Sequence, residues 1–257
     1  MKYYFLILCF LAEFTSIYSK ECSLIHHVAL GPEVYGVERM KHGGTRQFGT
    51  LAGIRLTYDR LKRCGWYVGG DALYATGTID GRSGSESKIR SSLTDKYIEG
   101  RFGYTFQQKN GCRFLFTPFV GIGCFQETND FKHPSPIPVH FQNTFSYIPF
   151  GFLSHLYLNE RLGLGLKLTV RYLFKQHNKV TNDPEHDDMI LQYKEELQYR
   201  LEFPITYDTC FCDRSWRIAL TPFFEYRPYG ELANFPFDFL DTKFRIFGAS
   251  LQLVLLL

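Results

Sequence analysis

The stretch Leu162–Phe174 reads LGLGLKLTVRYLF, and this stretch decides the class of fold. Every second residue is large and apolar, whereas the positions between are mostly glycine, threonine or a charged residue such as Lys167 and Arg171. Successive side chains of a β-strand point to opposite faces, so this strand has one apolar and one polar face. Helical spacing of apolar residues, three or four positions apart, is nearly absent. The stretch therefore predicts a strand with two unlike faces.

The same alternation recurs along the chain from residue 26 onward. In the next segment, Leu191–Tyr207, apolar residues again alternate with Gln, Lys, Glu and Arg. We expect ten antiparallel strands, near residues 26–39, 45–62, 65–79, 94–108, 112–126, 143–159, 162–175, 189–207, 215–228 and 243–257. An all-β chain of this length is commonly a single domain. The predicted fold class is therefore all-β, with one domain over residues 20–257.

Composition excludes two classes of protein. The 257 residues include 29 Lys and Arg against 26 Asp and Glu, and 17% of the residues are aromatic. Disordered chains have few aromatic residues and a large net charge, so disorder is excluded. The small excess of positive charge is scattered, whereas nucleic-acid binders gather theirs in a patch. No nucleic-acid partner is expected.

Short and long connections alternate between the predicted strands. The tight turns are at residues 62–64, 109–111, 159–161 and 208–214, and the longer segments are at 80–93, 127–142, 176–188 and 229–242, with a short exception at 41–44. Up-and-down barrels of the bacterial outer membrane have short periplasmic turns, longer outer loops and an even number of strands. The alternation therefore predicts a closed, antiparallel, transmembrane β-barrel of about ten strands.

The alternation alone does not say which face meets solvent, so a soluble barrel with a dry centre is an alternative. A Lys or Arg at the lipid midplane costs about 2–4 kcal/mol, so the charged face should line the lumen. Aromatic residues gather at strand ends, as at Trp66 and Trp216, and membrane interfaces favour aromatic residues. Membrane lipid is therefore the expected partner. Lys96 and Glu195 are exceptions, because they fall on the face that should meet lipid.

The predicted lumen carries nearly balanced charges. Its basic positions are Arg55, Arg101, Lys167, Arg171, Lys175, Lys194, Arg200, Arg217, Arg227 and Arg245, and its acidic positions are Glu33, Asp59, Asp71, Glu99, Glu196, Glu202 and Glu225. Balanced charges can pair with one another, and a ten-stranded barrel is narrower than open porins of about 16–18 strands. We expect a filled or narrow lumen. A transport role for these charges and a purely space-filling role both stay open.

Residues 1–19 have the pattern of a secretory signal peptide. Lys2 precedes the apolar segment Tyr3–Ala12, and Ser19 supplies a small residue before a cleavage position. The sequence therefore predicts export of the remaining chain.

Six cysteines follow this segment. Five of them fall at the tight-turn end of the predicted barrel, namely Cys22, Cys64, Cys112, Cys210 and Cys212, and Cys124 lies in the outer half of its strand. Exported proteins enter an oxidising compartment, but a disulfide requires Cα atoms within about 7 Å. Disulfides to periplasmic or envelope proteins, a local bridge of Cys22, and unpaired thiols are the alternatives. The one-residue spacing of Cys210 and Cys212 does not match a zinc site, and no metal or cofactor is expected.

The C-terminal residues carry a further pattern, since Phe247, Leu251, Leu253 and Leu257 share one face up to the end of the chain. This resembles the terminal strand of outer-membrane proteins, although Leu257 stands where an aromatic residue is usual. Together with the signal peptide and the alternating connections, the chain resembles a small bacterial outer-membrane β-barrel protein. The resemblance implies an outer-membrane location and names no subfamily.

Three functions follow from this interpretation. The first is a non-enzymatic outer-membrane barrel with a structural, surface-contact or narrow-channel role, its contacts made by the connections at 127–142 and 229–242. The second is an enzyme similar to omptin proteases, which also have ten strands and use Asp and His near the outer end. The segments Asp130–His133 and Asp183–Asp188 would supply these residues, with an Asp orienting a His as general base. The third is a soluble, secreted, ligand-binding barrel.

Overall fold

The computed structural model describes residues 24–41, 43–62, 64–107, 113–136, 138–183, 189–191, 197–211, 214–229 and 242–257. Within them lie twelve strands: β1 (Leu24–Lys41), β2 (Thr45–Lys62), β3 (Gly65–Arg82), β4 (Lys88–Gln107), β5 (Phe114–Lys132), β6 (His140–Tyr157), β7 (Leu162–Thr181), β8 (Met189–Leu191), β9 (Leu197–Glu202), β10 (Ile205–Phe211), β11 (Arg214–Tyr229) and β12 (Thr242–Leu256). None of the described residues belongs to a helix long and apolar enough to cross a membrane.

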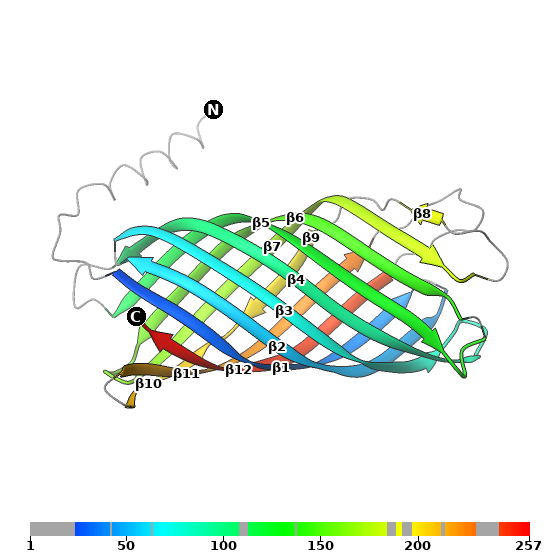
Figure 1. Cartoon of the computed structure of the whole chain (residues 1–257), viewed down its shortest axis with the longest axis horizontal. Helices are drawn as coiled ribbons and strands as arrows, with labels where there is room; N and C mark the ends of the chain where they lie inside the picture. The colour runs from blue at the N-terminus through cyan, green and yellow to red at the C-terminus, as the bar shows by residue number, and fades with distance from the viewer. Residues whose placement is uncertain are drawn as a thin grey trace.

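The strands form one closed, antiparallel ring (Figure 1). Strands β1 to β7 pair in chain order, β11 pairs with β12, and β12 pairs back with β1. The short strands β9 and β10 share the place between β7 and β11, and β8 pairs with the far end of β7. Ten strand positions therefore surround the lumen, and the predicted all-β barrel is confirmed.

The predicted strand over residues 189–207 is divided into pieces. Phe203 and Pro204 separate β9 from β10. Proline has no backbone N–H to donate to a neighbouring strand, so it interrupts the hydrogen-bond ladder. Both pieces still pair with β7 and β11, so the interruption leaves the ring closed.

The barrel wall is longer than the sequence predicted at the end where β1 joins β2, which we call the loop end. Strand β3 continues to Arg82 and β4 begins at Lys88, so the expected connection at 80–93 is mostly strand. Likewise β5 and β6 leave only residues 133–139 between them. The outward residues of these extensions are polar, as at Asp80, Lys88 and Arg90. Polar sequence was interpreted as loop. Pairing with a neighbouring strand, however, satisfies the backbone N–H and C=O groups whatever side chains the strand carries.

The apolar face looks outward, as predicted. Leu164 is 41% exposed, whereas Arg171 on the opposite face of the same strand is 4% exposed. Large apolar residues cover the outside between the short turns and the polar extensions, and we call this band the apolar belt: Leu30, Ile54, Trp66, Tyr74, Ile98, Phe102, Val120, Ile122, Phe150, Leu164, Ile218, Leu220, Leu251 and Leu253. A soluble barrel would bury this face, so the arrangement is that of a barrel surrounded by lipid.

Lys96 lies at the edge of the apolar belt toward the loop end. It is exposed and follows the outward parity of Ile98, and its ammonium group lies 5.6 Å from the centre of the Tyr74 ring. Cationic and aromatic side chains are the residues that membrane–water interfaces accommodate. The exception noted in the sequence is therefore an edge residue. Glu195 lies outside the described residues.

Candidate functional site: the ion-paired lumen

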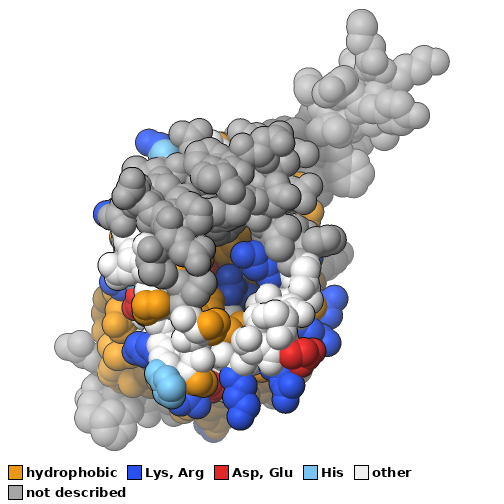
Figure 2. Space-filling view, turned by 90° about the vertical axis from the view of Figure 1, so that its right-hand side faces the viewer, with side chains coloured by type: hydrophobic (Ala, Val, Ile, Leu, Met, Phe, Trp, Pro, Cys, Tyr) orange, Lys and Arg blue, Asp and Glu red, His pale blue; other side chains and the backbone are white. Residues whose placement is uncertain are grey.

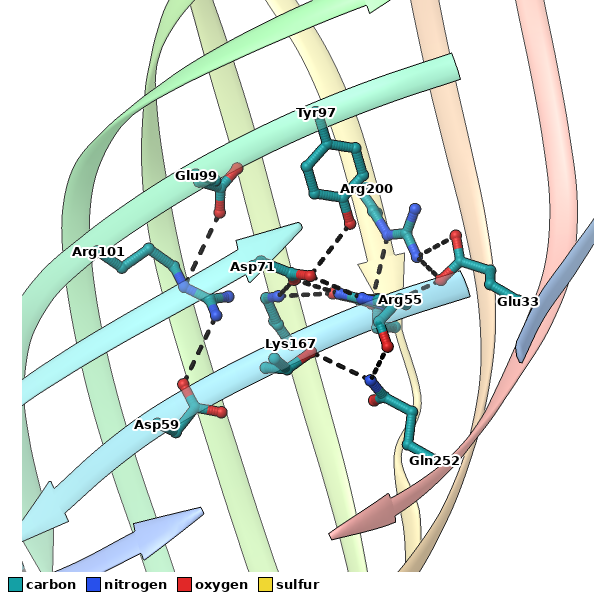
Figure 3. A network of polar contacts seen from close by, with 12 residues as sticks. Glu33, Arg55, Asp59, Asp71, Tyr97, Glu99, Arg101, Lys167, Arg200 and Gln252 are labelled. Atoms are coloured by element: carbon teal, nitrogen blue, oxygen red, sulfur yellow. Dashed lines mark hydrogen bonds and ion pairs between the residues drawn. The ribbon is translucent and has the colours of Figure 1, made fainter. Parts of the chain in front are cut away.

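The site begins with inward residues of neighbouring strands. Strand β2 directs Arg55 into the lumen, and β3 directs Asp71 beside it. Two nitrogens of the Arg55 guanidinium donate to the two carboxylate oxygens of Asp71, at 2.9 and 2.5 Å (Figure 3). Such two-point pairing is the strongest arrangement of arginine and carboxylate. Asp71 also accepts a hydrogen bond from the Tyr97 hydroxyl at 3.3 Å.

Other pairs cross the lumen. Arg55 on β2 donates to Glu202 on β9 at 2.5 Å, and Arg200 on β9 donates to Glu33 on β1 at 3.0 Å. Strand β9 pairs with β7 and β11, so it is a neighbour of neither β1 nor β2 in the ring. Lys167 on β7 pairs with its direct neighbour Glu202 at 2.9 Å and crosses the lumen to Asp71 on β3 at 3.4 Å. These contacts therefore join separate parts of the wall through the interior.

The network continues toward the loop end. Glu225 accepts hydrogen bonds from Arg171 at 2.5 Å, from Arg200 at 2.9 Å and from Arg227 at 2.6 Å. Arg227 on β11 also reaches Asp95 on β4 at 2.8 Å. A single carboxylate thus collects three guanidinium groups, and the last of these extends the network to the opposite wall.

The network is dry. Glu33 and Glu225 have no exposed surface, and Arg200 is 2% exposed. Charges in a water-filled channel would be exposed to solvent, so these side chains pack against one another and not against a pore. Removing charge from water is costly and is offset only by close pairing with several partners. The contacts above supply that pairing and fill this part of the lumen.

An apolar cluster covers the network on the loop-end side. Its buried members are Tyr35, Val37, Leu51, Leu73, Ala75, Ile79, Leu93, Tyr97, Phe125, Phe145, Tyr147, Leu173, Phe223, Tyr229, Phe244 and Ile246. The large apolar residues were predicted on the lipid face, and this buried cluster was not predicted. The alternation of each strand indicates it, because Tyr35 lies on the same strand face as Glu33 and Tyr97 on the same face as Glu99.

Glycine makes room for this packing. A Cβ atom at Gly123 would lie 2.3 Å from the Tyr147 ring, a separation that real atoms do not adopt. The ring can therefore lie over Gly123 and bring its hydroxyl to Glu99 at 3.2 Å. The missing side chain of the inward Gly123 thus leaves room for the large inward side chain of Tyr147.

Most predicted lumen residues lie in the network. These are Glu33, Arg55, Asp71, Glu99, Arg101, Lys167, Arg171, Arg200, Glu202, Glu225 and Arg227. Asp59 and Arg217 lie nearer the end that holds the short turns and the C-terminus, which we call the short-turn end; Arg217 pairs there with Asp208 at 2.5 and 2.9 Å. Lys194 and Glu196 lie outside the described residues.

Two lumen predictions were wrong. Arg245 faces outward between the inward Phe244 and Ile246, with 52% of its side chain exposed and Glu38 at 3.7 Å. The inward residues of β12, such as Ser250, have even residue numbers, so the odd-numbered Arg245 lies on the outer face. Lys175 is also exposed, because the register between β6 and β7 shifts at Ser146 and Tyr147.

Two buried carboxylates were missed. Asp95 accepts a hydrogen bond from the Tyr35 hydroxyl at 2.7 Å, and Glu127 accepts from Tyr229 at 2.9 Å and from Asn143 at 2.9 Å. Glu127 stands on the extension of β5 into the connection predicted at 127–142, whereas Asp95 lies at the start of the predicted strand 94–108 and shares the inward parity of Glu99.

Among the cysteines, the structure describes Cys64, Cys124 and Cys210, and no disulfide joins these three to one another. Cys124 is exposed on the outer face of β5. Cys22, Cys112 and Cys212 lie outside the described residues, as does the signal peptide predicted at 1–19. Disulfides to envelope partners stay a prediction.

The predicted Asp and His segments are only partly described. Asp130 forms a hydrogen bond with His140 of the neighbouring strand, whereas His133 is exposed. In the second segment only Asp183 is described. Within the part of the chain that the structure covers, no group of three or more His, Cys, Asp or Glu side chains is placed to hold a metal ion.

Known proteins resemble this chain in structure. The outer-membrane protease OmpT from Escherichia coli matches with a TM-score of 0.57 and 9% identity, over 95% of this chain and 100% of OmpT. The outer-membrane protein OprG from Pseudomonas aeruginosa gives 0.44 and 9%, over 92% of this chain and 97% of OprG. The translocator domain of the autotransporter NalP from Neisseria meningitidis gives 0.45 and 7%, over 96% and 95%.

No protein-family model and no curated protein sequence matches the chain. At such low identities the structural matches concern the fold alone. The match to OmpT shows that this chain has the fold of an outer-membrane β-barrel protein, and the outward apolar belt agrees with that fold.

Proposed function

We propose that this protein is a sealed outer-membrane barrel that serves envelope structure and surface contact and does not pass solutes. The lumen-crossing pair of Arg55 and Glu202, at 2.5 Å, carries this proposal. With Arg200 and Glu225 it belongs to a network whose members are almost without exposed surface. A solute would have to break several buried ion pairs to pass.

The extended wall supports the surface-contact part of the proposal. The two ends of β3 and β4 carry different outward residues. Belt residues such as Trp66 and Phe102 lie near the short turns, whereas polar residues such as Thr78 and Arg90 lie near the loop end. Figure 2 looks onto the loop end, where Lys and Arg side chains are visible inside the opening. In outer-membrane barrels the longer connections face outward from the cell. The loop end would then stand outside the membrane as the contact surface.

Electrical recording tests the sealed lumen. Refolded full-length protein in planar lipid bilayers should show no steady single-channel steps, and vesicles containing it should not swell in sugar solutions. An open porin treated in the same way is the positive control. Steady conductance steps of the unmodified protein would overturn the proposal.

Location has a separate test. Cell fractionation should recover the protein with the outer membrane, and carbonate washing without detergent should leave it there. The folded protein should also migrate differently on gels before and after boiling. Release by carbonate would favour the soluble secreted barrel.

A hydrolase is the second candidate, favoured by the hydrogen bond between Asp130 and His140. OmpT, whose fold is similar, is a protease. The pair lies on outward positions near the loop end, with 46% and 28% of the two side chains exposed. Purified protein should then cleave peptides or esters, and His140→Ala should remove the activity while His133→Ala leaves it unchanged. Absence of any hydrolysis by the refolded protein would discard this candidate.

A further inference from the structure

A cavity of about 150 Å³ lies between the ion network and the short-turn end, and both polar and apolar side chains line it. The network residues Arg55, Lys167 and Glu202 form its wall on one side. Thr57, Thr206, Thr221 and Gln252 add hydroxyl and amide groups, and His27, Asp59, Arg101 and Arg217 complete the ionisable lining. The cavity is the part of the lumen that the network leaves unfilled.

Glu202 and Arg101 are the described lining residues with buried polar atoms that lack a hydrogen-bond partner, and Oε2 of Glu202 still has the ammonium group of Lys167 at 2.9 Å. Arg101 has no comparably close partner. Only 1% of its side chain is exposed, and its Nε and Nη1 atoms have no hydrogen-bond partner. The carboxylates of Asp59 and Glu99 lie 3.5 and 3.8 Å away, beyond good hydrogen-bond distance (Figure 3). Asp59 instead accepts the Tyr67 hydroxyl at 2.5 Å.

The other guanidinium groups of the cavity differ in this respect. Arg55 donates to Asp71 and Glu202 at 2.5 to 2.9 Å, and Arg217 donates twice to Asp208 at 2.5 and 2.9 Å. A buried donor without an acceptor is costly and commonly marks a bound water or ion. Arg101 therefore supplies two free donors beside an empty volume.

We propose that this cavity binds a small oxyanion, held by Arg101 and Lys167. An oxyanion offers the several acceptor oxygens that a planar guanidinium binds in pairs. The threonine hydroxyls can donate to the remaining oxygens. The nearby carboxylates do not oppose this, because Glu202 is held by Arg55 and Lys167, and Asp59 is held by Tyr67. The volume admits a phosphate-sized ion and excludes large metabolites.

Calorimetric titration of the refolded full-length protein with inorganic phosphate tests this site. Unmodified protein should bind one phosphate saturably. Arg101→Gln should weaken binding at least about tenfold, the loss expected for a charged hydrogen-bond donor. Lys88→Gln, which removes an exposed cation outside the cavity, should leave binding unchanged.

A second variant guards against loss of folding. Ala219 lines the cavity and is buried, so Ala219→Leu would fill the volume while keeping every charge. It should abolish binding, with the heat-dependent gel shift retained as evidence of a closed barrel. Absence of binding by unmodified protein would mean that the cavity holds water only and would overturn the proposal. Equal binding by Arg101→Gln or Ala219→Leu would overturn it too.

Discussion

Arg55 on β2 and Glu202 on β9 form a 2.5 Å hydrogen bond through the centre of the barrel, although 147 positions separate them in the chain. Hydrogen bonds between adjacent strands set the stagger of the strands and with it the diameter of the ring. Pairs that cross the lumen fill this diameter and tie separate parts of the wall to one another. The network therefore helps to fill the interior of the barrel with packed side chains.

The first prediction concerns Arg200. Its guanidinium reaches both Glu33 and Glu225, and none of the three side chains is exposed by more than 2%. Arg200→Ala should lower the free energy of unfolding by about 3–5 kcal/mol, because it takes one guanidinium partner from each of two buried carboxylates and leaves the network with an excess of negative charge. Urea unfolding in lipid vesicles, followed by tryptophan fluorescence, measures this loss.

Arg245→Ala is the matched control, since this arginine lies outside with half of its side chain exposed. Its unfolding free energy should change by less than about 0.5 kcal/mol. Equal effects of the two substitutions would show that the network does not hold the barrel together.

Which residues line the lumen can be predicted from the sequence only while inward and outward positions alternate without interruption along a strand. Alternation places Lys167 and Arg171 inside because both share one face of an uninterrupted strand, and the structure has them there. Parity fails after an irregularity. Ser146 pairs with Lys175 but Tyr147 pairs with Leu173, so β7 has one extra residue and Lys175 turns outward. No residue type in the stretch announces this shift.

Partners are harder to predict than faces. Alternation says that Arg55 and Glu202 point inward, but not that they lie at the same height. The height depends on the tilt and stagger of the strands around the ring, which only the closed barrel sets. Glu127 was missed for another reason, because polar sequence on both faces hides a continuing strand. Asp95 lies within the predicted strand 94–108 and shares the inward parity of Glu99, so alternation could have found it. The candidate anion cavity was beyond the sequence, since it depends on which donors stay unpaired.

The second prediction tests the apolar belt. Ile98 is 66% exposed on the outside of β4 and lies in the belt. Ile98→Lys should cost about 2–4 kcal/mol if lipid surrounds this position. Thr78→Lys, at an exposed outward position of β3 between the apolar belt and the loop end, should cost less than about 1 kcal/mol. Folding efficiency and urea midpoints in vesicles compare the two, and a harmless Ile98→Lys would contradict a membrane location for the belt.

The third prediction concerns space inside the lumen. An added methyl group at Gly123 would meet the Tyr147 ring at 2.3 Å, whereas one at Gly100 would meet nothing within 4 Å. Gly123→Ala should destabilise the barrel by about 1–3 kcal/mol, because a packed interior has to shift. Gly100→Ala should change stability little. Thermal unfolding of both variants, read from the loss of the folded gel band, makes the comparison, and equal melting would show that the ring moves freely.

The fourth prediction measures how burial changes the value of an ion pair. Arg217 and Asp208 share two hydrogen bonds near the short-turn end, with 9% and 26% of their side chains exposed. Arg82 and Glu86 pair at a similar distance of 2.9 Å but are 64% and 78% exposed. Double-mutant cycles to alanine should give a coupling of about 1–3 kcal/mol for the first pair and below about 0.5 kcal/mol for the second.

Salt sharpens this comparison, because ions screen exposed charges more strongly than partly buried ones. Raising sodium chloride to about 1 M, where the screening length falls to about 3 Å, should remove what coupling Arg82 and Glu86 have. The pair of Arg217 and Asp208 should keep most of its coupling, since protein and not solvent surrounds Arg217. Equal loss in both pairs would mean that water fills the short-turn end, and that Arg217 holds its carboxylate there as an exposed surface pair.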